Sequence, residues 1–352
     1  MHAETRLRVL LVVCSVLFSL AVLELGLRAR LGLGHLLDWS NAFAPSRQRD
    51  DPSTYYIIHH PVQGFVPRPG YASPAINHDA DGFRVTPGTP KWTDKTVLAV
   101  GDSFTFGADV ADRETWPTYL QADVGRRIVN GGVPGYGLDQ MVLQAERVVP
   151  AVRPDILVVS FIADDLDRME MSRVWGVEKP YFLLQDGKLV LQRQPVPPSP
   201  PPGSTYSAWH RMFGWSYLVA AVEKRVLLDR HEWIGDSVRA QPRGAGEGMV
   251  CPLLARLAGV GRPTLVVAQY DQAVWQDAGY SREARRLSRR VLDCAASTGF
   301  ATLDLFADTD RAVRTLGYDA VYFGMHHTGE GNRVAARAIA AELRRLGWLP
   351  PP

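Results

Sequence analysis

The sequence lacks an excess of charge of either sign. Lys and Arg number 39 and Asp and Glu 37 in 352 residues, so the formal net charge at pH 7 is +2. No basic stripe with interleaved aromatic residues occurs, so nucleic acid is not expected as a partner. No Walker loop and no dinucleotide fingerprint follows a predicted strand, so we expect neither a nucleotide-phosphate site nor a nicotinamide cofactor. The pair His59-His60 has no second pair of ligands at metal-site spacing. We therefore expect no metal and no cofactor.

Cysteine is scarce, with three residues in the chain. Cys14 lies in an apolar run and is expected only to pack there. Cys251 and Cys294 lie in two segments that flank the same predicted strand. They could form a disulfide if the domain is outside the cytoplasm, and they would be buried thiols inside it. The sequence leaves both states of this pair open.

Long apolar runs are also rare, and one stands out near the N-terminus. The segment VLLVVCSVLFSLAVL, from Val9 to Leu23, carries no charge. Its neighbours extend it to a span of about 20 residues, the length that crosses a hydrocarbon core. We predict a transmembrane anchor over residues 7–27. A cleaved signal peptide and a buried helix are the alternatives, and residues 24–30 hold no clear small-x-small cleavage site. Arginines flank the run on both sides, so the positive-inside rule leaves the orientation open.

Further along, short apolar runs alternate with amphipathic segments. Residues 30–95 are rich in Pro, Gly and aromatic residues and predict an irregular leader with short β structure. The predicted strands are Thr96–Val100, Ile128–Asn130, Ile156–Phe161, Thr264–Tyr270 and Ala301–Leu305. Helices are predicted after the N-cap Thr115 and over Leu138–Val149, Ser281–Thr298 and Gly331–Leu346. This alternation indicates an α/β domain with a parallel sheet covered on both faces.

One long interruption, residues 167–247, separates the third predicted strand from the fourth. It contains the hairpin pattern YFLLQDGKLVLQ, which turns at Asp186-Gly187, and a proline tract with the composition of a stiff linker. An aromatic-rich helix is predicted near Trp209–Trp233, and the low-complexity loop RAQPRGAGEG follows it. A lid, a membrane-facing patch and a partner surface are all compatible with this insertion.

The segment GDSFTFG begins directly after the predicted strand TVLAV and contains Ser103. Ligands bind at the carboxyl ends of strands in open parallel sheets, so a nucleophile is expected at this position. A serine at a strand-to-helix turn exposes its Oγ, while nearby backbone N–H groups face an incoming oxyanion. A second GDS triplet, Gly235 to Ser237, is predicted to follow a helix and to lead into a polar loop. Its context does not indicate a nucleophile.

Five blocks in a fixed order carry a family resemblance: GDSFTFG, ETWP, NGGVPGYGLDQ, RPDILVVSFIADD and MHHTGEGNRVAA. Together they resemble the blocks of SGNH/GDSL hydrolases, from Asn77 to Leu346 apart from the insertion. The resemblance is closest to membrane-anchored bacterial members, which also carry an upstream segment like HDADGFR. It implies a flavodoxin-like, doubly wound, five-stranded parallel sheet in a domain over residues 96–348. It also implies a single-pass protein of the cell (inner) membrane with an extracytoplasmic, periplasmic catalytic domain.

The resemblance assigns roles position by position. Ser103 takes the role of the nucleophile. His326, in the spacing His-x-Thr-x-x-Gly, takes that of the general base, and His327 is one residue out of register. The oxyanion hole would use the backbone N–H groups of Ser103 and Gly132, since a glycine lets the backbone approach the substrate closely. Asp164 occupies the third oxyanion position.

Two positions depart from the family pattern. Asp164 stands where the family has Asn. An ionised Asp cannot donate a hydrogen bond to the oxyanion, whereas an Asp kept protonated by its neighbour Asp165 and the site could. Phe323 stands three residues before His326, where the family places the Asp that orients the base. Without that Asp, a backbone carbonyl or another carboxylate has to orient the histidine. The carboxylates considered for this role are Asp304, Asp308 and Asp319.

The expected function is ester hydrolysis through an acyl-enzyme, or acyl transfer to a sugar hydroxyl by the same serine. The expected substrate is an ester, and the resemblance to anchored members favours an O-acylated (acetylated) extracytoplasmic polysaccharide. The competing hypothesis is a catalytically degenerate SGNH domain that binds a glycan or a protein partner without turnover. Its basis is the pair of changes at Asp164 and Phe323.

Overall fold

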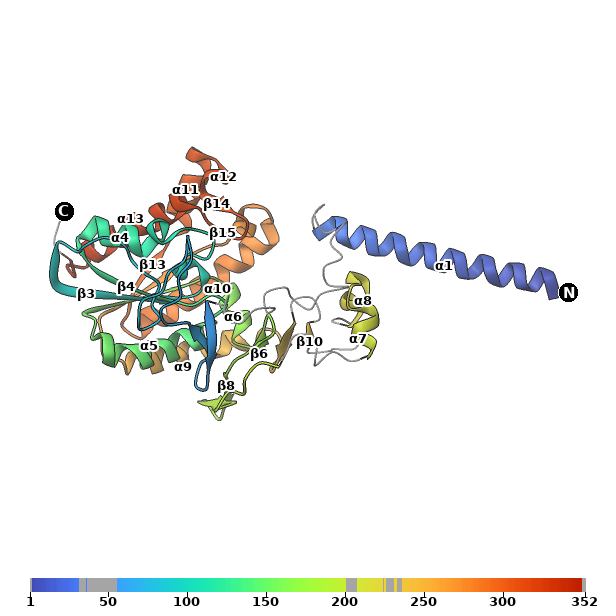
Figure 1. The fold of residues 1–352 in the computed structure, drawn as a ribbon, viewed down its shortest axis with the longest axis horizontal. Coiled ribbons are helices and arrows are strands. Elements are labelled where there is room, and N and C mark those ends of the chain that lie inside the picture. The colour runs from blue at the N-terminus through green and yellow to red at the C-terminus, as the bar shows by residue number, and fades with distance from the viewer. Residues whose placement is uncertain are drawn as a thin grey trace. The chain divides into compact units, whose positions relative to one another are not determined.

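The computed structural model describes residues 2–31, 36, 56–200, 208–223, 225, 231, 232 and 236–349. Contacts divide the chain into two units, whose elements are drawn in Figure 1. The larger unit contains residues 56–172, 178–198 and 240–352. The smaller unit contains residues 1–55, 173–177 and 199–239. The predicted insertion therefore contributes residues to both units.

The larger unit is built on a parallel five-stranded sheet in the order β13-β12-β5-β3-β4. Its strands are β3 (Trp92–Gly101), β4 (Arg126–Gly132), β5 (Ile156–Phe161), β12 (Thr264–Ala268) and β13 (Ala301–Asp304). Each strand corresponds to one of the predicted apolar runs, so the predicted parallel α/β sheet is confirmed. Every residue of β5 and β12 is buried, which explains why these runs are continuously apolar instead of alternating.

Helices cover both faces of this sheet (Figure 1). On one face α4 (Trp116–Val124) packs beside α13 (Gly329–Arg345), and both contribute buried side chains to one cluster with the sheet. The other face carries α5 (Leu138–Val152), α9 (Ala245–Ala258) and α10 (Ala278–Ser297). Helix α4 begins as predicted, because the Thr115 side chain accepts a hydrogen bond from the N–H of Thr118 and Pro117 lies in the first turn.

The register of the sheet brings several loops to its carboxyl edge. Gly101, at the end of β3, is opposite Gly132 of β4 and Ser160 of β5. Ser160 is in turn opposite Val267 of β12. The segments that follow these four strands therefore leave the sheet side by side, at the edge where open parallel sheets bind their ligands.

Short elements complete the larger unit. Strands β1 (Ile57–His60) and β2 (Gly64–Pro67) form a hairpin in the leader, most of which before residue 56 lies outside the described residues. Strands β8 (Tyr181–Gln185) and β9 (Lys188–Gln192) form the hairpin predicted at Asp186-Gly187. The other elements are α3 (Ser103–Phe106), η4 (Asp112–Glu114), α6 (Asp164–Arg168), η6 (Gln272–Trp275), α11 (Phe306–Leu316), α12 (Tyr318–Val321), β14 (Tyr322–Phe323) and β15 (His326–His327).

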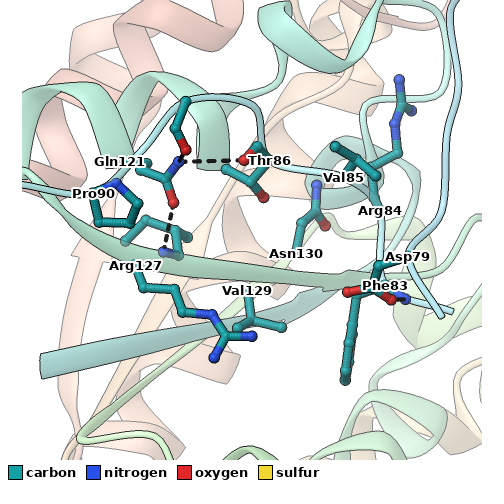
Figure 2. Close-up of a pocket in the computed structure, with 12 residues that line it drawn as sticks. Asp79, Phe83, Arg84, Val85, Thr86, Pro90, Gln121, Arg127, Val129 and Asn130 are labelled. Carbon is teal, nitrogen blue, oxygen red and sulfur yellow. Dashed lines mark hydrogen bonds between the residues drawn. The ribbon is translucent and has the colours of Figure 1, made fainter. Parts of the chain in front are cut away.

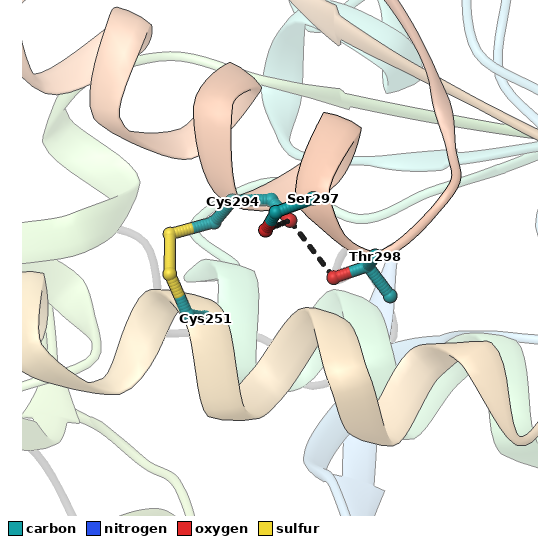
Figure 3. Close-up of a disulfide and its surroundings, with 4 residues drawn as sticks. All are labelled: Cys251, Cys294, Ser297 and Thr298. Atoms are coloured by element: carbon teal, nitrogen blue, oxygen red, sulfur yellow. Dashed lines mark hydrogen bonds between the residues drawn. A yellow bond between two sulfur atoms is a disulfide. The ribbon is translucent and has the colours of Figure 1, made fainter.

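Helix α9 begins at Ala245, inside the segment that the sequence predicts to be a low-complexity loop. Two glycines and Pro252 lower its helix propensity, but packing overrides them. A Cβ on Gly246 would lie 2.3 Å from the carbonyl oxygen of Leu166, so the glycine allows the helix to approach the chain after β5 closely. A disulfide joins Cys251 of α9 to Cys294 of α10 (Figure 3). It ties together two helices that cover the same face of the sheet.

The smaller unit contains helix α1 (His2–Leu31), α7 (Ala208–Phe213), α8 (Tyr217–Val222) and the antiparallel strands β10 (His231–Glu232) and β11 (Ser237–Arg239). Two further strands, β6 (Met171–Val174) and β7 (Val177–Glu178), lie where the chain passes between the units. Residues Glu4–Arg30 of α1 contain one long, nearly uncharged apolar stretch. This helix is long and apolar enough to cross a membrane, and a signal sequence would meet the same criteria.

The single aromatic-rich helix predicted near Trp209–Trp233 is wrong. The described residues form two short helices, because α7 ends at Phe213 and Ser216 starts a new helix as its N-cap. The Ser216 side chain accepts a hydrogen bond from the Val219 N–H at 3.1 Å, as an N-cap does. Trp233 and the last prolines of the linker tract lie outside the described residues.

Candidate active site

Ser103 is the first residue of α3, and one residue, Asp102, separates it from the end of β3. Asp102 caps this short helix, since its side chain accepts a hydrogen bond from the Phe104 N–H at 2.9 Å. A Cβ on Gly101 would lie 2.1 Å from Thr105 Oγ1, so only glycine allows the strand to turn this tightly into the helix. The turn leaves Ser103 at the carboxyl edge of the sheet with 5% of its surface exposed.

His326 lies on β15, in the short hairpin that precedes α13. Its Nε2 is 2.8 Å from Ser103 Oγ. The Phe104 ring packs edge-on against the imidazole, with centroids 5.2 Å apart, and limits its rotation. The structure thus brings together the two residues predicted as nucleophile and base. The distance is one at which the histidine can accept the serine proton.

The other ring nitrogen of His326 contacts a carboxylate that no sequence motif marks. Asp109 Oδ2 lies 2.6 Å from His326 Nδ1. Asp109 is in the loop that follows α3, so nucleophile and carboxylate come from one short stretch of chain. A histidine that donates its Nδ1–H to Asp109 has Nε2 free to accept a proton from Ser103. The imidazole therefore bridges a hydroxyl and a carboxylate.

The carboxylates considered from the sequence are bonded elsewhere. Asp304 accepts a hydrogen bond from a tyrosine hydroxyl at 2.9 Å, and Asp308 pairs with an arginine at 3.4 Å. Within the described residues, neither these two nor Asp319 contacts His326. Phe323 is directly opposite His326 in the β14–β15 pair and is 69% exposed. The carboxylate beside His326 therefore comes from the loop that follows α3 and not from the C-terminal block.

Arg84, from the upstream segment HDADGFR, holds the loop that carries Asp109. Its guanidinium donates to the carbonyl oxygens of residues 106, 107 and 110 at 3.1, 2.8 and 2.8 Å. Its Nε pairs with Asp112 Oδ1 at 2.7 Å, and the guanidinium lies 4.7 Å from the centroid of the Phe106 ring. Arg84 is 1% exposed. One buried arginine thus fixes the backbone on both sides of Asp109.

A pocket of about 270 Å³ lies beside this arginine, between the upstream segment and β4 (Figure 2). Arg84 and Asn130 line it, as does Gln121, whose amide donates to the carbonyl of residue 86 at 3.3 Å and accepts from the N–H of residue 128 at 3.1 Å. Neither Ser103 nor His326 lines this pocket. It is therefore not the place where an ester would react.

The predicted oxyanion glycine is bonded within the protein. The Gly132 N–H donates to Asn130 Oδ1 at 3.1 Å. A Cβ on Gly132 would lie 2.4 Å from the backbone nitrogen of Phe106, so this glycine is needed for contact with α3. In the described loop 132–136, the Gly135 N–H has no hydrogen-bond partner, and Gly135 has a φ of 82°. If this loop supplies the predicted second oxyanion donor, that donor is either the Gly132 N–H, which is already bonded to Asn130, or the Gly135 N–H.

Asp164, at the third position predicted for the oxyanion hole, contacts a tyrosine. Tyr280 Oη lies 2.9 Å from Asp164 Oδ1 and 2.5 Å from Asp271 Oδ2. Asp271 follows β12, and Tyr280 is in the first turn of α10. Burial raises the pKa of Tyr280 and also that of Asp271. Neither residue belongs to a sequence block, and the contact links Asp164 to a segment more than 100 residues further along the chain, in which Asp271 and Tyr280 are nine positions apart.

Asp165, the neighbour considered as a proton partner for Asp164, contacts Arg168 instead. Its Oδ2 accepts a hydrogen bond from the Ile162 N–H at 2.9 Å, and its Oδ1 pairs with the Arg168 guanidinium. The same guanidinium lies 3.7 Å from Asp102 Oδ2. Burial raises the pKa of both the Asp102 and the Asp165 carboxyl, and the Arg168 charge opposes this change. Asp102, Asp165 and Arg168 thus form a buried charged cluster that supports the turn before Ser103.

His327 and Ser237 do not contact the proposed nucleophile. His327 is buried with its Nε2 3.3 Å from the Tyr322 hydroxyl, and burial lowers its pKa to about 3. Ser237 is the first residue of β11, and its Oγ accepts a hydrogen bond from the Trp175 N–H at 3.1 Å. The context predicted for the second GDS triplet is therefore wrong, because the short strand β10 precedes the triplet and its serine is the first residue of β11. Its serine has a structural partner.

Comparisons with other proteins place the chain in one family. Residues 99–334 match the sequence profile of the GDSL-like Lipase/Acylhydrolase family. Among solved structures, the chain is similar to an alpha/beta hydrolase enzyme from the metagenome of Lake Arreo, Spain, with 15% identity, 72% of this chain and 97% of that chain covered, and a TM-score of 0.42. It is similar to a catalytic mutant of an acetylxylan esterase from Geobacillus stearothermophilus, with 16% identity, 73% and 96% covered, and a TM-score of 0.43. For a lipase/acylhydrolase from Enterococcus faecalis, the corresponding values are 14%, 73%, 98% and 0.41. No curated protein matches the sequence.

Proposed function

Because this chain belongs to the GDSL-like lipase/acylhydrolase family, we propose that it is a serine ester hydrolase whose catalytic triad is Ser103, His326 and Asp109. One observation carries the proposal. The His326 ring lies between Ser103 Oγ, at 2.8 Å from Nε2, and Asp109 Oδ2, at 2.6 Å from Nδ1. An imidazole held in this way between a hydroxyl and a carboxylate is the arrangement that activates a serine nucleophile.

In the acylation step, Ser103 Oγ transfers its proton to His326 Nε2 and attacks the ester carbonyl. The negative charge that forms on the carbonyl oxygen is stabilised by the Ser103 N–H and by one N–H of the loop after β4. Asp109 stabilises the imidazolium through its bond to Nδ1. His326 then gives the proton to the leaving alcohol as the ester C–O bond breaks, which leaves an acyl-enzyme on Ser103.

In the second half of the reaction, a water molecule gives a proton to His326 Nε2 while its oxygen attacks the acyl carbon. The bond to Ser103 Oγ breaks, Oγ takes the proton back, and the carboxylic acid is released. If a sugar hydroxyl takes the place of water, the same sequence transfers the acyl group to the sugar.

The alternative of a degenerate binding domain has two sequence departures as its basis, and the structure bears on them differently. Phe323 removes the family acid, but Asp109 supplies a carboxylate to the same ring nitrogen. Asp164 remains a carboxylate at a position where the reaction needs a donor. A domain that binds an acylated ligand without turnover therefore stays as the second candidate, on that one residue.

We propose an O-acylated extracytoplasmic polysaccharide as the substrate class, which rests on the resemblance to anchored family members. Acetate release from an O-acetylated polysaccharide, compared with p-nitrophenyl acetate as a minimal ester, tests this choice. A much higher kcat/KM for the polymer supports it. Activity on the small ester without release from acetylated polymers would overturn the substrate class and leave the esterase proposal intact.

We propose that α1 remains in the mature protein as a membrane anchor. Its apolar side chains up to Leu23 are exposed, whereas Glu24 and Arg28 are buried within the smaller unit. Glu24 caps α8, because its carboxylate accepts from the Ser216 hydroxyl at 2.8 Å and from the Tyr217 N–H at 3.0 Å. A cleaved signal peptide would remove this cap from the protein.

Arg28 supports the same proposal. It pairs with Glu24 at 2.7 Å, donates to the carbonyl of Trp215 at 2.7 Å and lies 4.8 Å over the Tyr217 ring. The intact mass of protein extracted from the membrane fraction tests retention. A mass that includes residues 2–31 is expected, and a mature form that begins after Arg30 would contradict the anchor.

The disulfide between Cys251 and Cys294 supports an extracytoplasmic catalytic domain, because disulfides persist in oxidising compartments such as the periplasm. Protease added to intact spheroplasts is expected to degrade the larger unit. Protection of that unit in sealed spheroplasts would place it on the cytoplasmic side.

Hydrolysis of p-nitrophenyl acetate by the parent protein, Ser103→Ala and Ser237→Ala tests the esterase proposal. Ser237 belongs to the second GDS triplet and is the matched control. The Ser103 variant should fall to the rate of the buffer, and the Ser237 variant should keep the parent rate. Equal activity of the parent and Ser103→Ala would exclude this serine as the nucleophile.

A further inference from the structure

Asp164, Tyr280 and Asp271 make contacts with one another that require an extra proton. Tyr280 Oη lies 2.9 Å from Asp164 Oδ1 and 2.5 Å from Asp271 Oδ2. A phenol has one proton and can donate it to one of these oxygens. The second contact is a hydrogen bond only if that carboxyl group carries a proton and donates it to the phenol oxygen. Two ionised carboxylates would leave one short oxygen–oxygen contact with no proton in it.

The surroundings favour the protonated arrangement. In the described part of the chain, neither Asp164 nor Asp271 forms an ion pair, and Asp271 is 5% exposed. Burial raises the pKa of Asp271, the Tyr280 hydrogen bond lowers it and the Asp164 charge raises it. The pKa of Tyr280 is also raised, chiefly by burial, so the phenol keeps its own proton.

The charged and titratable groups around these three residues come from several elements. The Asp164 charge raises the pKa of Asp165 and of Arg168, both in α6. The charge of Asp102 raises the pKa of the same two residues. Desolvation by burial raises the pKa of Tyr318 in α12 and of Tyr322 in β14, and the Asp271 charge adds to this rise. Arg168 is the one cation in this set, and its guanidinium pairs with Asp165. The Arg168 charge therefore acts on Asp164 as well as on Asp165, whereas no cation is among the groups that shift the pKa of Asp271.

We propose that Asp164, Tyr280 and Asp271 share one carboxyl proton and form a relay that moves negative charge away from the oxyanion. This inference rests on the proposed function, because it concerns the oxyanion of the Ser103 reaction. Ser103, Asp164 and Asp271 follow β3, β5 and β12, which are neighbours in the sheet, so all three lie along the same carboxyl edge.

In the resting state the Asp271 carboxyl donates its proton to Tyr280 Oη, and the Tyr280 hydroxyl donates to Asp164. When negative charge develops on the ester oxygen, the Tyr280 O–H bond breaks and an O–H bond forms on Asp164 Oδ1. At the same time the Asp271 O–H bond breaks and a new O–H bond forms on Tyr280. No proton leaves the cluster. Asp164 becomes neutral and the charge moves to Asp271, so a residue that would repel the oxyanion no longer does.

Infrared spectroscopy tests the shared proton without using the reaction. A protonated carboxyl group has a carbonyl stretch that is separate from the carboxylate bands, and the difference between parent and variant isolates one residue. At neutral pH, Asp271→Asn should remove such a band, and Tyr280→Phe should shift or remove it. Asp304→Asn is the control, because Asp304 accepts from one tyrosine hydroxyl and needs no extra proton. A parent band that Asp271→Asn leaves unchanged would overturn the shared proton.

Steady-state kinetics test the consequence for catalysis. With p-nitrophenyl acetate, Tyr280→Phe should lower kcat by about 10- to 100-fold, since the loss of one oxyanion contact typically costs at least that much. Adding Asp164→Asn to Tyr280→Phe should restore kcat, because a neutral amide does not need the relay. In the parent, kcat should fall at alkaline pH as the cluster loses its proton, and Asp164→Asn should remove that fall.

The outcomes separate the relay from the esterase proposal. The relay would be overturned if kcat of Asp164→Asn fell at alkaline pH as in the parent. It would also be overturned if adding Asp164→Asn did not restore the kcat lost in Tyr280→Phe. Both results leave Ser103-dependent hydrolysis intact. Activity that does not depend on Ser103 would overturn the esterase proposal, and the infrared result would still decide whether the proton is shared.

Discussion

His326 Nδ1 lies 2.6 Å from Asp109 Oδ2, so the carboxylate beside the proposed base is carried by the loop just beyond α3. In the family pattern the acid stands three residues before the histidine, at the position of Phe323. The two positions reach the ring from different segments, since Phe323 is on β14 and Asp109 follows α3. The Asp109 side chain is 39% exposed, so water screens part of its charge. Its main contribution is then to orient the imidazole and fix its tautomer.

Restoring the family acid should compensate for the loss of Asp109. Phe323 and His326 are directly opposite in an antiparallel pair, so their side chains lie on the same face of the hairpin. Asp109→Ala should lower kcat, and Phe323→Asp added to it should recover part of the loss. Phe323→Asp alone should change kcat little, because the nitrogen is already bonded. If Phe323→Asn restored kcat of Asp109→Ala to the same extent as Phe323→Asp, a negative charge at position 323 would not be the cause of the recovery.

Removing Arg84 should reduce stability and activity together. Arg84→Ala leaves the Asp112 carboxylate without its buried guanidinium, and breaking a buried pair costs about 3–5 kcal/mol of unfolding free energy. Urea unfolding measures this loss. Arg84→Lys keeps the charge but not the planar set of donors, so it should retain more stability while kcat still falls. Arg311→Ala, at an exposed pair with Asp308, is the control and should change the free energy by less than about 1 kcal/mol. A stable Arg84→Ala protein with parent kcat would contradict the role of Arg84 in placing the Asp109 loop.

The buried His327 should make the protein less stable in acid. Its pKa is about 3 in the folded protein and about 6.5 in the unfolded chain. Below pH 6.5 the unfolded chain therefore binds more protons, so stability falls as the pH drops towards 3, by up to about 1.4 kcal/mol per pH unit. His327→Gln should reduce the slope of unfolding free energy against pH in this window. Equal slopes for the parent and the variant would show that His327 does not contribute.

The disulfide should stabilise the larger unit. It closes a loop between positions 43 residues apart, and the chain-entropy relation gives about 4 kcal/mol for a loop of that size. Cys251→Ser should therefore lower Tm under oxidising conditions, whereas reductant should lower the Tm of the parent and leave that of the variant unchanged. Cys14→Ser, outside the disulfide, is the control. Mass spectrometry of non-reduced protein that shows free thiols at both Cys251 and Cys294 would contradict the disulfide.

The sheet can be predicted from the sequence because its strands are buried on both faces and read as continuous apolar runs, as in Ile156–Phe161. Helix α9 is harder to predict, since its glycines and Pro252 lower helix propensity and only packing against Leu166 explains Gly246. The insertion is misread near Trp209 because Gly214 and Ser216 divide one apolar pattern into two helices.

The candidate site shows the same division between local and long-range signals. Ser103 and His326 can be identified because a strand or a helix start beside each gives it a local context. Asp109 has no such context, and its place depends on how Arg84 holds the loop. No sequence motif marks Tyr280 or Asp271 either, because their contact with Asp164 forms only when the segments after β5 and β12 meet the first turn of α10.

The central claim is that Asp109 activates Ser103 through His326, and the rate of labelling of Ser103 by a fluorophosphonate tests it most directly. Parent protein, Asp109→Asn and Asp319→Asn are compared, with Ser103→Ala as the blank. Replacing the triad Asp by Asn in a serine protease lowers turnover by about 10⁴-fold. We predict that Asp109→Asn labels about 10²- to 10⁴-fold more slowly than the parent and that Asp319→Asn labels at the parent rate. Labelling of Asp109→Asn at the parent rate, with Asp319→Asn slow, would contradict the account.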